Sequence, residues 1–495
     1  MPRGAEPAAP PAPRKGHGPA LLALLALTAV RLLVAGLAPL SPDEAYYWTW
    51  SHALAPGFPD HPPMVALWIR AGTALAGETR LGVRLLAPLS AALGSALLWR
   101  AAEDILPGRH AGTPAAALLN ATLLLGVGAV TMTPDTPLLF FWCAALAAAG
   151  RLLRTGRGAW WLALGLAAGC AGESKYTAAL LGAGLALWLL AVPEGRRWLH
   201  TPWPWAGGAL AAAAFAPNLA WNAAHGWASL GKQGGRTADW HPARALRFEP
   251  ELLAGQLALA TPLVLAACAA GTWRALRAWP APGPALLAAL TLPGAAVFLE
   301  HATGDRVQAN WPAILYPAAA IAAGGLVRHW RPAAALGFAL AVPVYLQAAA
   351  APFPLPRALD PTLARLGGWP GLARQLAALA TPDTPAPVLA ADEYGLASEL
   401  AWLDAAPTVL GVEPRWATFD LPHLALDGRP VLLLRSERRV EAPDPALWAD
   451  ARQVATLTRE RDGRLAERYR LYRAVGRPGL SGAVLPSTKP AAHLP

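Results

Sequence analysis

About eleven stretches of this chain are apolar and long enough to cross a lipid bilayer as helices. A spanning helix needs about 20 residues and must satisfy its backbone polar groups internally, because hydrocarbon offers no partner. The predicted spans are residues 18–39, 81–101, 111–130, 134–151, 159–173, 175–192, 205–222, 251–271, 282–299, 309–327 and 332–351. The fifth and sixth are short and nearly continuous, so one helix broken at Gly172 to Lys175 is the alternative. The pattern predicts an all-α polytopic membrane protein.

The charge content of the chain changes near residue 351. Of the 31 acidic residues, 16 follow that position although most of the chain precedes it. The contrast predicts a small C-terminal α/β soluble domain, with strands at 387–391, 430–435 and 468–475 and a helix at 393–403. The expected organisation is a disordered cytoplasmic N-terminus (1–18), a transmembrane domain (19–351) with an outer loop (40–80), a periplasmic α/β domain (352–476) and a disordered tail (477–495).

Basic and acidic residues distribute differently between the two predicted faces. With the N-terminus inside, the short inner loops are basic, as in Arg151, Arg154 and Arg157, which agrees with the positive-inside rule. Eleven of the 15 acids before residue 351 fall on the outer face, together with the longer loops. An odd number of spans places the C-terminal domain outside, whereas fusing the fifth and sixth spans would place it inside. The basic residues that set the orientation explain the net charge of +10, so nucleic-acid binding is not needed to explain it.

The three cysteines fall inside predicted spans. Cys143, Cys170 and Cys268 are therefore expected to behave as small apolar side chains. Neither a disulfide framework nor a metal-thiolate site is predicted.

The first outer loop holds the densest group of polar residues. Asp43 and Glu44 follow Pro42, which suits the first turn of a helix, where carboxylates are favoured. Asp60 and His61 follow within twenty residues. The alternative for the first group is a capped interfacial helix with an aromatic belt of Tyr46, Tyr47, Trp48 and Trp50.

Further outer residues could contact an anion or support a reaction. Asp135 lies at the outer end of a span, where an N-cap is the alternative role. Glu173 and Lys175 lie at the junction of two apolar runs, where ionisable pairs are costly and tend to be functional. Outer basic segments carry His225, Lys232, Arg236 and Arg306, for which contact with anionic lipid headgroups is the alternative.

Outer carboxylates that face outer cations beside a bilayer suit one chemistry. A carboxylate can accept the proton of an attacking hydroxyl group, and cations or a metal can stabilise a leaving phosphate. The predicted reaction is transfer of a sugar from a phosphate whose lipid anchor stays in the membrane.

Several motifs resemble those of a known family. The matching segments are Pro42-Asp43-Glu44-Ala45-Tyr46-Tyr47, Asp60-His61-Pro62-Pro63, Gly82-Val83-Arg84, Thr133-Pro134-Asp135 and Ser174-Lys175-Tyr176. They are similar to motifs of bacterial membrane glycosyltransferases of the dolichyl-phosphate-mannose protein mannosyltransferase-like type, and more distantly to the aminoarabinose transferase acting on lipid A. The similarity covers approximately residues 20–350.

The resemblance implies a GT-C fold, a polyprenyl-phosphate sugar donor, inversion at the anomeric carbon and catalysis on the periplasmic face of the bacterial inner membrane. It implies that Asp43 is the catalytic base, with Glu44 beside it. Asp60-His61 occupies the place of a Glu-Lys pair that serves a metal and the donor phosphate in the aminoarabinose transferase. Because His61 replaces that lysine, either it contacts phosphate when protonated or its imidazole binds a metal.

The complete set of expected site residues follows from these arguments. Catalytic residues are Asp43 and Glu44; donor phosphate ligands are His61, Lys175, Lys232, Arg236 and Arg306; supporting residues are Asp135, Glu173 and Tyr46; metal ligands are Asp60, His61 and His225. A divalent metal is the one cofactor considered. The expected partners are the polyprenyl-phosphate sugar donor, a glycan, lipid or protein acceptor, and membrane lipids.

Two other classes of function are alternatives to the transferase. A polytopic transporter or lipid carrier would place ionisable residues deep inside its spans. Arg31 is the main such residue, and it is expected to snorkel toward the interface. A non-catalytic GT-C-like envelope assembly protein would keep the fold, so that only activity separates it from the enzyme.

Overall fold

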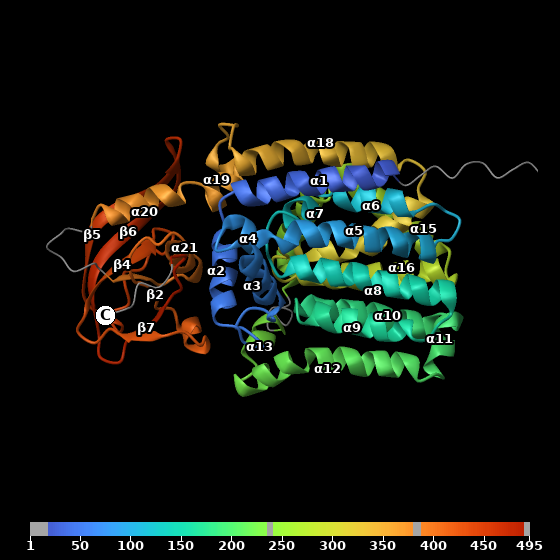
Figure 1. Cartoon of the computed structure of the whole chain (residues 1–495), viewed down its shortest axis with the longest axis horizontal. Coiled ribbons are helices and arrows are strands. Elements are labelled where there is room, and N and C mark those ends of the chain that lie inside the picture. Colours follow the sequence, from blue (N-terminus) through green and yellow to red (C-terminus); the bar gives the residue numbers. More distant parts are fainter. Residues whose placement is uncertain (1–17, 235–240, 380–387, 490–495) are drawn as a thin grey trace, which may run out of the picture.

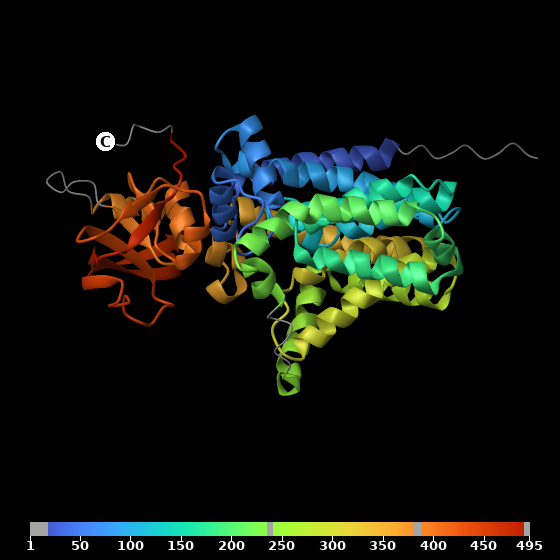
Figure 2. The same ribbon diagram turned by 90° about the horizontal axis from the view of Figure 1, so that it is seen from below.

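A computed structural model describes residues 18–234, 241–379 and 388–489 of the chain. Its helices form a bundle with nearly aligned axes, and a sheet domain covers one end of that bundle (Figure 1). Helices α2, α3 and α4 lie between the bundle and the sheet domain, whereas the first turn of α1 lies at the opposite end. The view from below shows the same division, with one arm of the chain projecting from the bundle (Figure 2).

The helices of the chain have the following bounds. They are α1 (Gly18–Leu37), α2 (Pro42–His52), α3 (Met64–Ala76), α4 (Arg80–Arg84), α5 (Leu86–Ile105), α6 (Gly112–Asn120), α7 (Leu123–Gly128), α8 (Asp135–Thr155), α9 (Trp160–Gly172), α10 (Ala179–Ala191), α11 (Pro193–Leu199), α12 (Trp203–Ala224), α13 (Ala228–Gly234), α14 (Ala245–Leu259), α15 (Pro262–Arg277), α16 (Pro282–Ala302), α17 (Tyr316–Leu326), α18 (Trp330–Ala349), α19 (Pro361–Leu366), α20 (Trp369–Ala377) and α21 (Tyr394–Trp402). Short 3-10 helices are η1 (Tyr176–Ala178), η2 (Pro242–Arg244), η3 (Trp311–Leu315), η4 (Arg357–Leu359) and η5 (Pro414–Thr418).

Five helical segments in the described part of the chain are long and apolar enough to cross a membrane. They are Gly18–Leu37, Arg80–Ile105, Asp135–Thr155, Pro282–Ala302 and Trp330–Ala349. The number rises to 7 if two sharply bent helix pairs, α10 with α11 and α14 with α15, each count as one span. The chain is therefore a multi-pass membrane protein, while the count of eleven spans stays a prediction.

Three sequence predictions about single spans can be compared with the helices. The fifth and sixth spans are separate helices, α9 and α10, joined by η1. The span predicted at 111–130 is divided into α6 and α7. The span predicted at 251–271 falls on a sharply bent helix pair, because α14 ends at Leu259 and the chain turns by 106° into α15. Thr261, at that turn, has a φ of 69°, a conformation that interrupts a helix.

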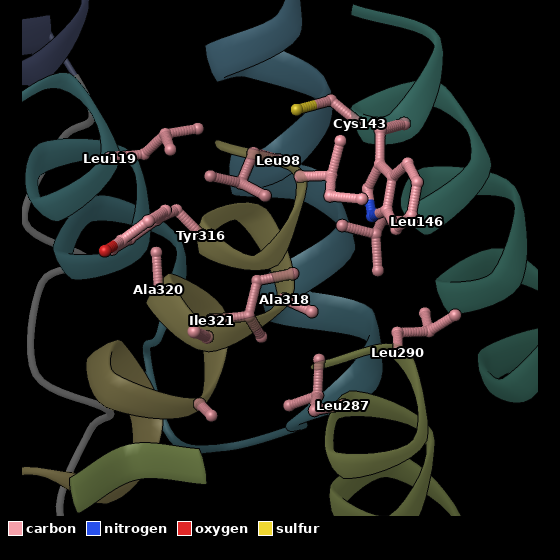
Figure 3. Close-up of a cluster of buried hydrophobic side chains, with 14 of the residues drawn as sticks. Leu98, Leu119, Cys143, Leu146, Leu287, Leu290, Tyr316, Ala318, Ala320 and Ile321 are labelled. Atoms are coloured by element: carbon pink, nitrogen blue, oxygen red, sulfur yellow. The ribbon is translucent and has the colours of Figure 1, made fainter. Parts of the chain in front are cut away.

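Small residues let the bundle helices pack closely. Gly165 of α9 faces Gly207 of α12, and a Cβ atom on either would overlap the backbone of the other helix. The core contains Leu98 of α5, Leu146 of α8 and Leu287 of α16, which point toward one another in Figure 3. Apolar contact and close backbone approach, the usual basis of helix association in membranes, therefore hold this bundle together.

Arg31 lies inside this bundle and does not snorkel, so that expectation is wrong. Its side chain is 1% exposed, and its described partners are the Asn120 amide oxygen at 2.7 Å and the Tyr345 hydroxyl at 3.1 Å. These two hydrogen bonds satisfy part of the hydrogen-bonding capacity of the guanidinium inside the protein, so the side chain need not extend to the interface.

The first outer loop folds into α2 and α3, and its aromatic residues are buried. Tyr46, Trp48 and Trp50 are at most 2% exposed, which rules out the alternative of an interfacial aromatic belt. They share one hydrophobic core with Trp416 and Phe419 of the C-terminal domain. The loop and the domain therefore lie on the same face of the bundle, as the sequence predicted.

The C-terminal domain is built on a mixed seven-stranded sheet. Its strands are β1 (Leu389–Ala391), β2 (Val409–Gly411), β3 (His423–Ala425), β4 (Pro430–Ser436), β5 (Trp448–Arg461), β6 (Arg464–Gly476) and β7 (Ser481–Val484), in the order β3-β7-β2-β1-β4-β6-β5. Strand β1 is parallel to β2 and β4, and the remaining pairs are antiparallel. The predicted strands at 387–391, 430–435 and 468–475 and the helix at 393–403 correspond to β1, β4, β6 and α21.

The prediction of a disordered tail from residue 477 is wrong for the part that the structure describes. Strand β7 pairs with β2 and β3, and Ala483 is fully buried. Residues 490–495, like the predicted N-terminal tail at 1–17, lie outside the described residues.

Candidate active site

Helix α2 begins with a complete capping box. The Ser41 hydroxyl accepts a hydrogen bond from the Glu44 amide, while the Glu44 carboxylate accepts one from the Ser41 amide at 3.0 Å. Pro42 occupies the first helical turn, where its missing N–H leaves no bond unmade. Residues 41–44 therefore fix the start of α2, as the sequence indicated.

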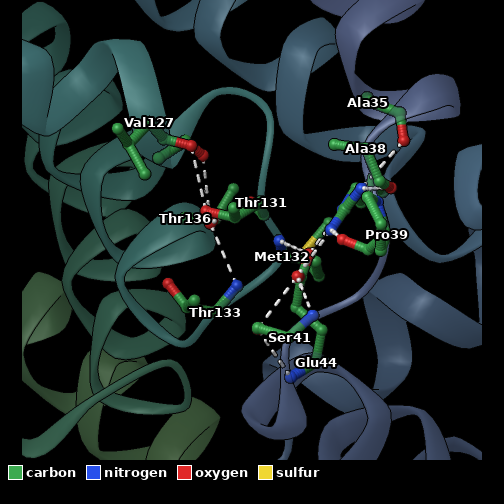
Figure 4. A network of polar contacts seen from close by, with 12 residues as sticks. Ala35, Ala38, Pro39, Ser41, Glu44, Val127, Thr131, Met132, Thr133 and Thr136 are labelled. Carbon is green, nitrogen blue, oxygen red and sulfur yellow. Dashed lines mark hydrogen bonds and ion pairs between the residues drawn. The ribbon is translucent and has the colours of Figure 1, made fainter. Parts of the chain in front are cut away.

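Glu44 is also bound to two other elements (Figure 4). Arg84 of α4 donates to both of its carboxylate oxygens, at 2.6 and 2.7 Å, and the Met132 amide donates at 3.0 Å. Burial alone would raise the pKa of Glu44, but the charge and hydrogen bonds of Arg84 lower it overall, so the group is ionised.

These contacts correct the assignment of Glu44 as a catalytic residue. The side chain is 0% exposed, and its carboxylate is surrounded by donors from the protein itself. An acceptor hydroxyl group therefore has no access to it. Glu44 holds α2, α4 and the segment before α8 in place.

Asp43, the adjacent acid, is accessible. Its side chain is 40% exposed, and one oxygen accepts a hydrogen bond from the Tyr394 hydroxyl at 3.2 Å. The other oxygen lies 3.6 Å from a guanidinium nitrogen of Arg365. Of the two predicted catalytic acids, Asp43 is thus the one that can meet a substrate.

Asp60 joins three parts of the chain. One carboxylate oxygen forms an ion pair with Lys232 of α13, and the other accepts from Tyr46 of α2 and Arg415 of η5, each at 2.9 Å. Burial alone would raise the pKa of Asp60, but the hydrogen bond from Lys232 and the charge of Arg415 lower it. The carboxylate is therefore charged and neutralised by two cations.

His61 follows Asp60 and lies among charged groups. Burial, followed by the charge of Lys175, lowers the pKa of His61 to about 4. The imidazole is therefore neutral near pH 7, and it can contact a phosphate only as a neutral hydrogen-bond donor. The surroundings of His61 therefore favour the neutral form over the cationic form that the sequence left open.

Lys175, between α9 and η1, is held by Asp135. Its ammonium nitrogen lies 2.8 and 3.0 Å from the two carboxylate oxygens, and Asn310 donates to the same carboxylate at 2.6 Å. An ammonium group has three donors, so one remains for a further acceptor. Asp135 thus holds Lys175, and it is not the N-cap of α8, because Pro134 occupies that position.

A cavity of about 300 Å³ opens beside these residues. His61, Lys175 and Tyr176 present polar groups to it, whereas Leu180 of α10 and Val297 and Phe298 of α16 form an apolar wall. Its remaining lining residues are Thr177, Leu230, Gln233, Gly234, His301 and Trp311. One site thus combines cationic and hydrocarbon surfaces.

A polar network positions α13 at the edge of this cavity. The Tyr176 hydroxyl bonds to Ser229 and to Asn218 of α12, and Asn222 accepts from the Ser229 hydroxyl at 2.9 Å.

The backbone carbonyl of Glu173 accepts from the Met64 amide at 3.0 Å, which joins α9 to α3. Glu173 supports the site through this backbone bond.

Of the predicted site residues that the structure describes, His61 and Lys175 line the cavity, whereas Arg306 and His225 are held elsewhere. Arg306 pairs with Glu251 at 2.6 Å in an exposed contact. His225 stacks on Trp221, with ring centroids 4.2 Å apart, at an exposed position. Arg236 lies outside the described residues.

The expected metal ligands do not fit a metal site. Asp60 already faces two cations, and His225 does not lie with Asp60 and His61. Among residues 18–234, 241–379 and 388–489, no three His, Cys, Asp or Glu side chains gather as a candidate site. The cysteines in this part of the chain are unpaired, which agrees with the sequence.

Comparison with known proteins identifies the fold. Residues 60–221 match the family model "Dolichyl-phosphate-mannose-protein mannosyltransferase". The structure superposes on ArnT from Cupriavidus metallidurans bound to undecaprenyl phosphate with a TM-score of 0.62, at 17% identity, covering 92% of this chain and 98% of that one. The chain has the GT-C fold of ArnT. The apo form of ArnT gives a TM-score of 0.60 at 15% identity, with the same coverage.

A curated relative extends the comparison. Lipid A galacturonosyltransferase RgtD of Rhizobium johnstonii is 30% identical over 285 residues, which are 57% of this chain and 59% of that protein. The match thus spans less than two thirds of the relative. Together with the fold, these matches confirm the predicted resemblance to GT-C glycosyltransferases.

Sequence reasoning missed the residues that the C-terminal domain contributes. Tyr394 and Arg415 contact Asp43 and Asp60 from positions more than 350 residues away in the chain. No local pattern marks them, since each lies near the start of an ordinary helical segment. Arg84 lies within one of the family motifs, but the sequence spacing of Arg84 and Glu44 does not indicate that they pair.

Proposed function

We propose that this protein is an inverting glycosyltransferase that moves a sugar from a polyprenyl-phosphate donor to a hydroxyl group of an acceptor. The cavity is the observation that carries the proposal. Lys175 and His61 provide polar contacts for a phosphate, and Leu180, Val297 and Phe298 provide an apolar wall for a hydrocarbon chain. A lipid-linked phosphate needs both surfaces side by side.

The chemistry follows from the groups around the cavity. Asp43 accepts the proton of the acceptor hydroxyl while the hydroxyl oxygen forms a bond to the anomeric carbon. The bond from that carbon to the phosphate oxygen breaks, and its electron pair leaves with the polyprenyl phosphate. Attack opposite the leaving group inverts the anomeric configuration. Lys175, oriented by Asp135, stabilises the charge of the leaving phosphate.

The fold alone does not identify the acceptor or the location of the protein, so both are part of the proposal. We infer lipid A or a related glycolipid as the acceptor, because RgtD is a lipid A galacturonosyltransferase. A galacturonosyl donor is the first to test for the same reason. The proposed location is the bacterial inner membrane, with the N-terminus cytoplasmic and the cavity and C-terminal domain periplasmic.

The two other classes of function have less support. A transporter would use ionisable groups along its spans, but Arg31 is held by Asn120 and Tyr345 inside the bundle. The family match and the ArnT fold favour a transferase. A non-catalytic assembly protein would retain the fold but would not depend on Asp43.

The test is transfer by the purified protein in lipid nanodiscs. A panel of radiolabelled undecaprenyl-phosphate sugars, beginning with galacturonosyl, is incubated with lipid A acceptors and with wild type or Asp43→Asn. Asp450→Asn, whose carboxylate is 61% exposed in the C-terminal domain, is the control. Wild type and Asp450→Asn should transfer one sugar, whereas Asp43→Asn should lose at least about 100-fold in rate. Full activity of folded Asp43→Asn would refute the proposal.

A further inference from the structure

The C-terminal domain reaches the proposed catalytic base through Tyr394. Its hydroxyl donates to Asp43 at 3.2 Å from the first residue of α21. The next residue, Gly395, lies so close to α2 that a Cβ atom there would be 2.8 Å from the Cβ atom of Pro42. This close packing fixes Tyr394 over the start of α2.

Two other side chains lie near the Asp43 carboxylate. A guanidinium nitrogen of Arg365 lies 3.6 Å away, and the buried phenol of Tyr47 lies one helical turn further along α2. Arg365 is 65% exposed, so solvent screens its charge. Tyr394, at 3.2 Å, therefore makes the shorter of these two contacts with the Asp43 carboxylate.

Arg415 is the second link from the domain. It donates to Asp60 at 2.9 Å and to Glu413 at 3.0 Å, and its guanidinium lies over the Tyr394 ring, 4.2 Å from the centroid. Asp60 in turn pairs with Lys232, and Gln233 donates to the Asp60 carbonyl oxygen at 2.9 Å. Arg415 thus acts on α13 through Asp60.

The ionisation states agree with these roles. Burial, followed by the charge of Asp43, raises the pKa of Tyr394 well above its usual value. The phenol therefore stays protonated and can donate. Burial opposes the charge of Arg415, but Tyr46 and Asp60 raise its pKa, so the guanidinium stays charged.

Docking of the domain does not require these polar contacts. Trp416 and Phe419 pack against Tyr46 and Trp50 in the shared hydrophobic core, with ring centroids 5.5 to 6.3 Å apart. The apolar cluster holds the domain on α2. The polar contacts instead converge on Asp43 and on Asp60, which precedes the cavity residue His61.

We propose that the C-terminal domain completes the active site: Tyr394 positions the Asp43 carboxylate, and Arg415 positions Asp60 and, through it, Lys232. The proposal rests on the proposed function, because it assigns roles within that reaction. Tyr394 acts through Asp43 and Arg415 acts through Asp60, so both are positioning residues. Because the guanidinium of Arg415 stacks on the Tyr394 ring, the contacts of Tyr394 with Asp43 and of Arg415 with Asp60 are also connected to each other.

Tyr394→Phe tests the first link in the nanodisc transfer assay. Loss of a hydrogen bond to a charged carboxylate should move the acidic limb of the kcat/KM profile upward by about one pH unit. Activity should recover toward the wild-type value at alkaline pH. Tyr472→Phe is the matched control, because Tyr472 lies on the other face of the sheet and its hydroxyl makes no hydrogen bond with any described residue.

Arg415→Gln tests the second link. Displacement of α13, whose Gln233 lines the cavity, should raise the KM for the donor about tenfold while kcat changes less. Arg415→Lys should fail to restore it, because an ammonium group cannot reproduce the stacked, two-point geometry. Arg452→Gln, at a 78% exposed arginine of the same domain, is the control. Elution volume and melting temperature identify variants that fail to fold.

The outcomes separate the inference from the function. Absence of transfer by wild type from the whole donor panel would overturn both. Transfer by wild type, with folded Tyr394→Phe and Arg415→Gln matching their controls in pH profile and donor KM, would overturn the positioning roles alone. The predicted shift in either variant, absent from its control, supports that link.

Discussion

Glu44 and Arg84 form a buried two-point ion pair, with nitrogen–oxygen distances of 2.6 and 2.7 Å. Asp43, the preceding residue, is 40% exposed and faces the C-terminal domain. Two adjacent acids therefore have different roles because α2 turns one toward α4 and the other toward Tyr394.

Glu44→Gln should destabilise the protein strongly. Removing one partner of a buried ion pair costs about 3–5 kcal/mol, because the other charge stays buried without compensation. Arg452→Gln, which breaks an exposed pair, should cost less than about 1 kcal/mol. The apparent melting temperature in detergent measures both; equal values would contradict the structural role of Glu44.

The same pair has a defined pH range. Because the folded-state pKa of Glu44 lies below its ordinary value, its stabilisation is present at neutral pH. It should be lost only as the pH falls through that lowered value, below the range in which an ordinary glutamate titrates. A melting temperature that falls between about pH 7 and about pH 6 in wild type but not in Glu44→Gln would contradict this assignment.

Gly207→Ala should weaken the contact between α9 and α12. The added methyl group would overlap the Trp161 carbonyl oxygen, and overpacking costs about 1–3 kcal/mol. Gly208→Ala is the matched control: it is exposed in the same helix, with no described atom within 4 Å of its Cβ position. The melting temperature should fall for the first variant only; equal effects would show that close backbone contact is unimportant here.

Lys175→Gln should weaken donor binding. Lys175 lines the cavity, and loss of its ammonium should raise the KM for the donor at least about tenfold. Arg306→Gln should leave that KM within about twofold, because Arg306 pairs with Glu251 in an exposed contact. The reverse order of effects would place the phosphate on the Arg306 side.

Donor binding should not follow the titration of an ordinary histidine. With a pKa of about 4, His61 stays neutral as the pH rises from about 5.5 to about 8. The donor KM should therefore show no increase centred near about pH 6.5, and His61→Gln should have the same pH dependence. An increase in wild type that the variant lacks would show a cationic His61.

A chelator should not abolish transfer. Asp60 is neutralised by Lys232 and Arg415, an arrangement that repels a divalent cation. Transfer in about 1 mM EDTA should match that in its absence, since no step is assigned to a metal. Loss of transfer that added Mg²⁺, Mn²⁺ or Zn²⁺ restores would contradict this prediction.

The sequence by itself determined the membrane character, the division near residue 351 and the capping of α2. Apolar run length and capping residues act over a few helical turns, so they can be read locally. The family motifs brought Asp43, Asp60 and Lys175 to attention, and the structure places them at one end of the bundle.

Only the tertiary structure decided what each charged group does. Glu44 became structural because Arg84, 40 residues away, meets it in a buried position. The neutral state of His61 depends on burial and on Lys175, and the contacts of Asp43 and Asp60 depend on Tyr394 and Arg415. Burial and long-range charge pairing arise when distant segments pack together, and no local pattern in the chain encodes that packing.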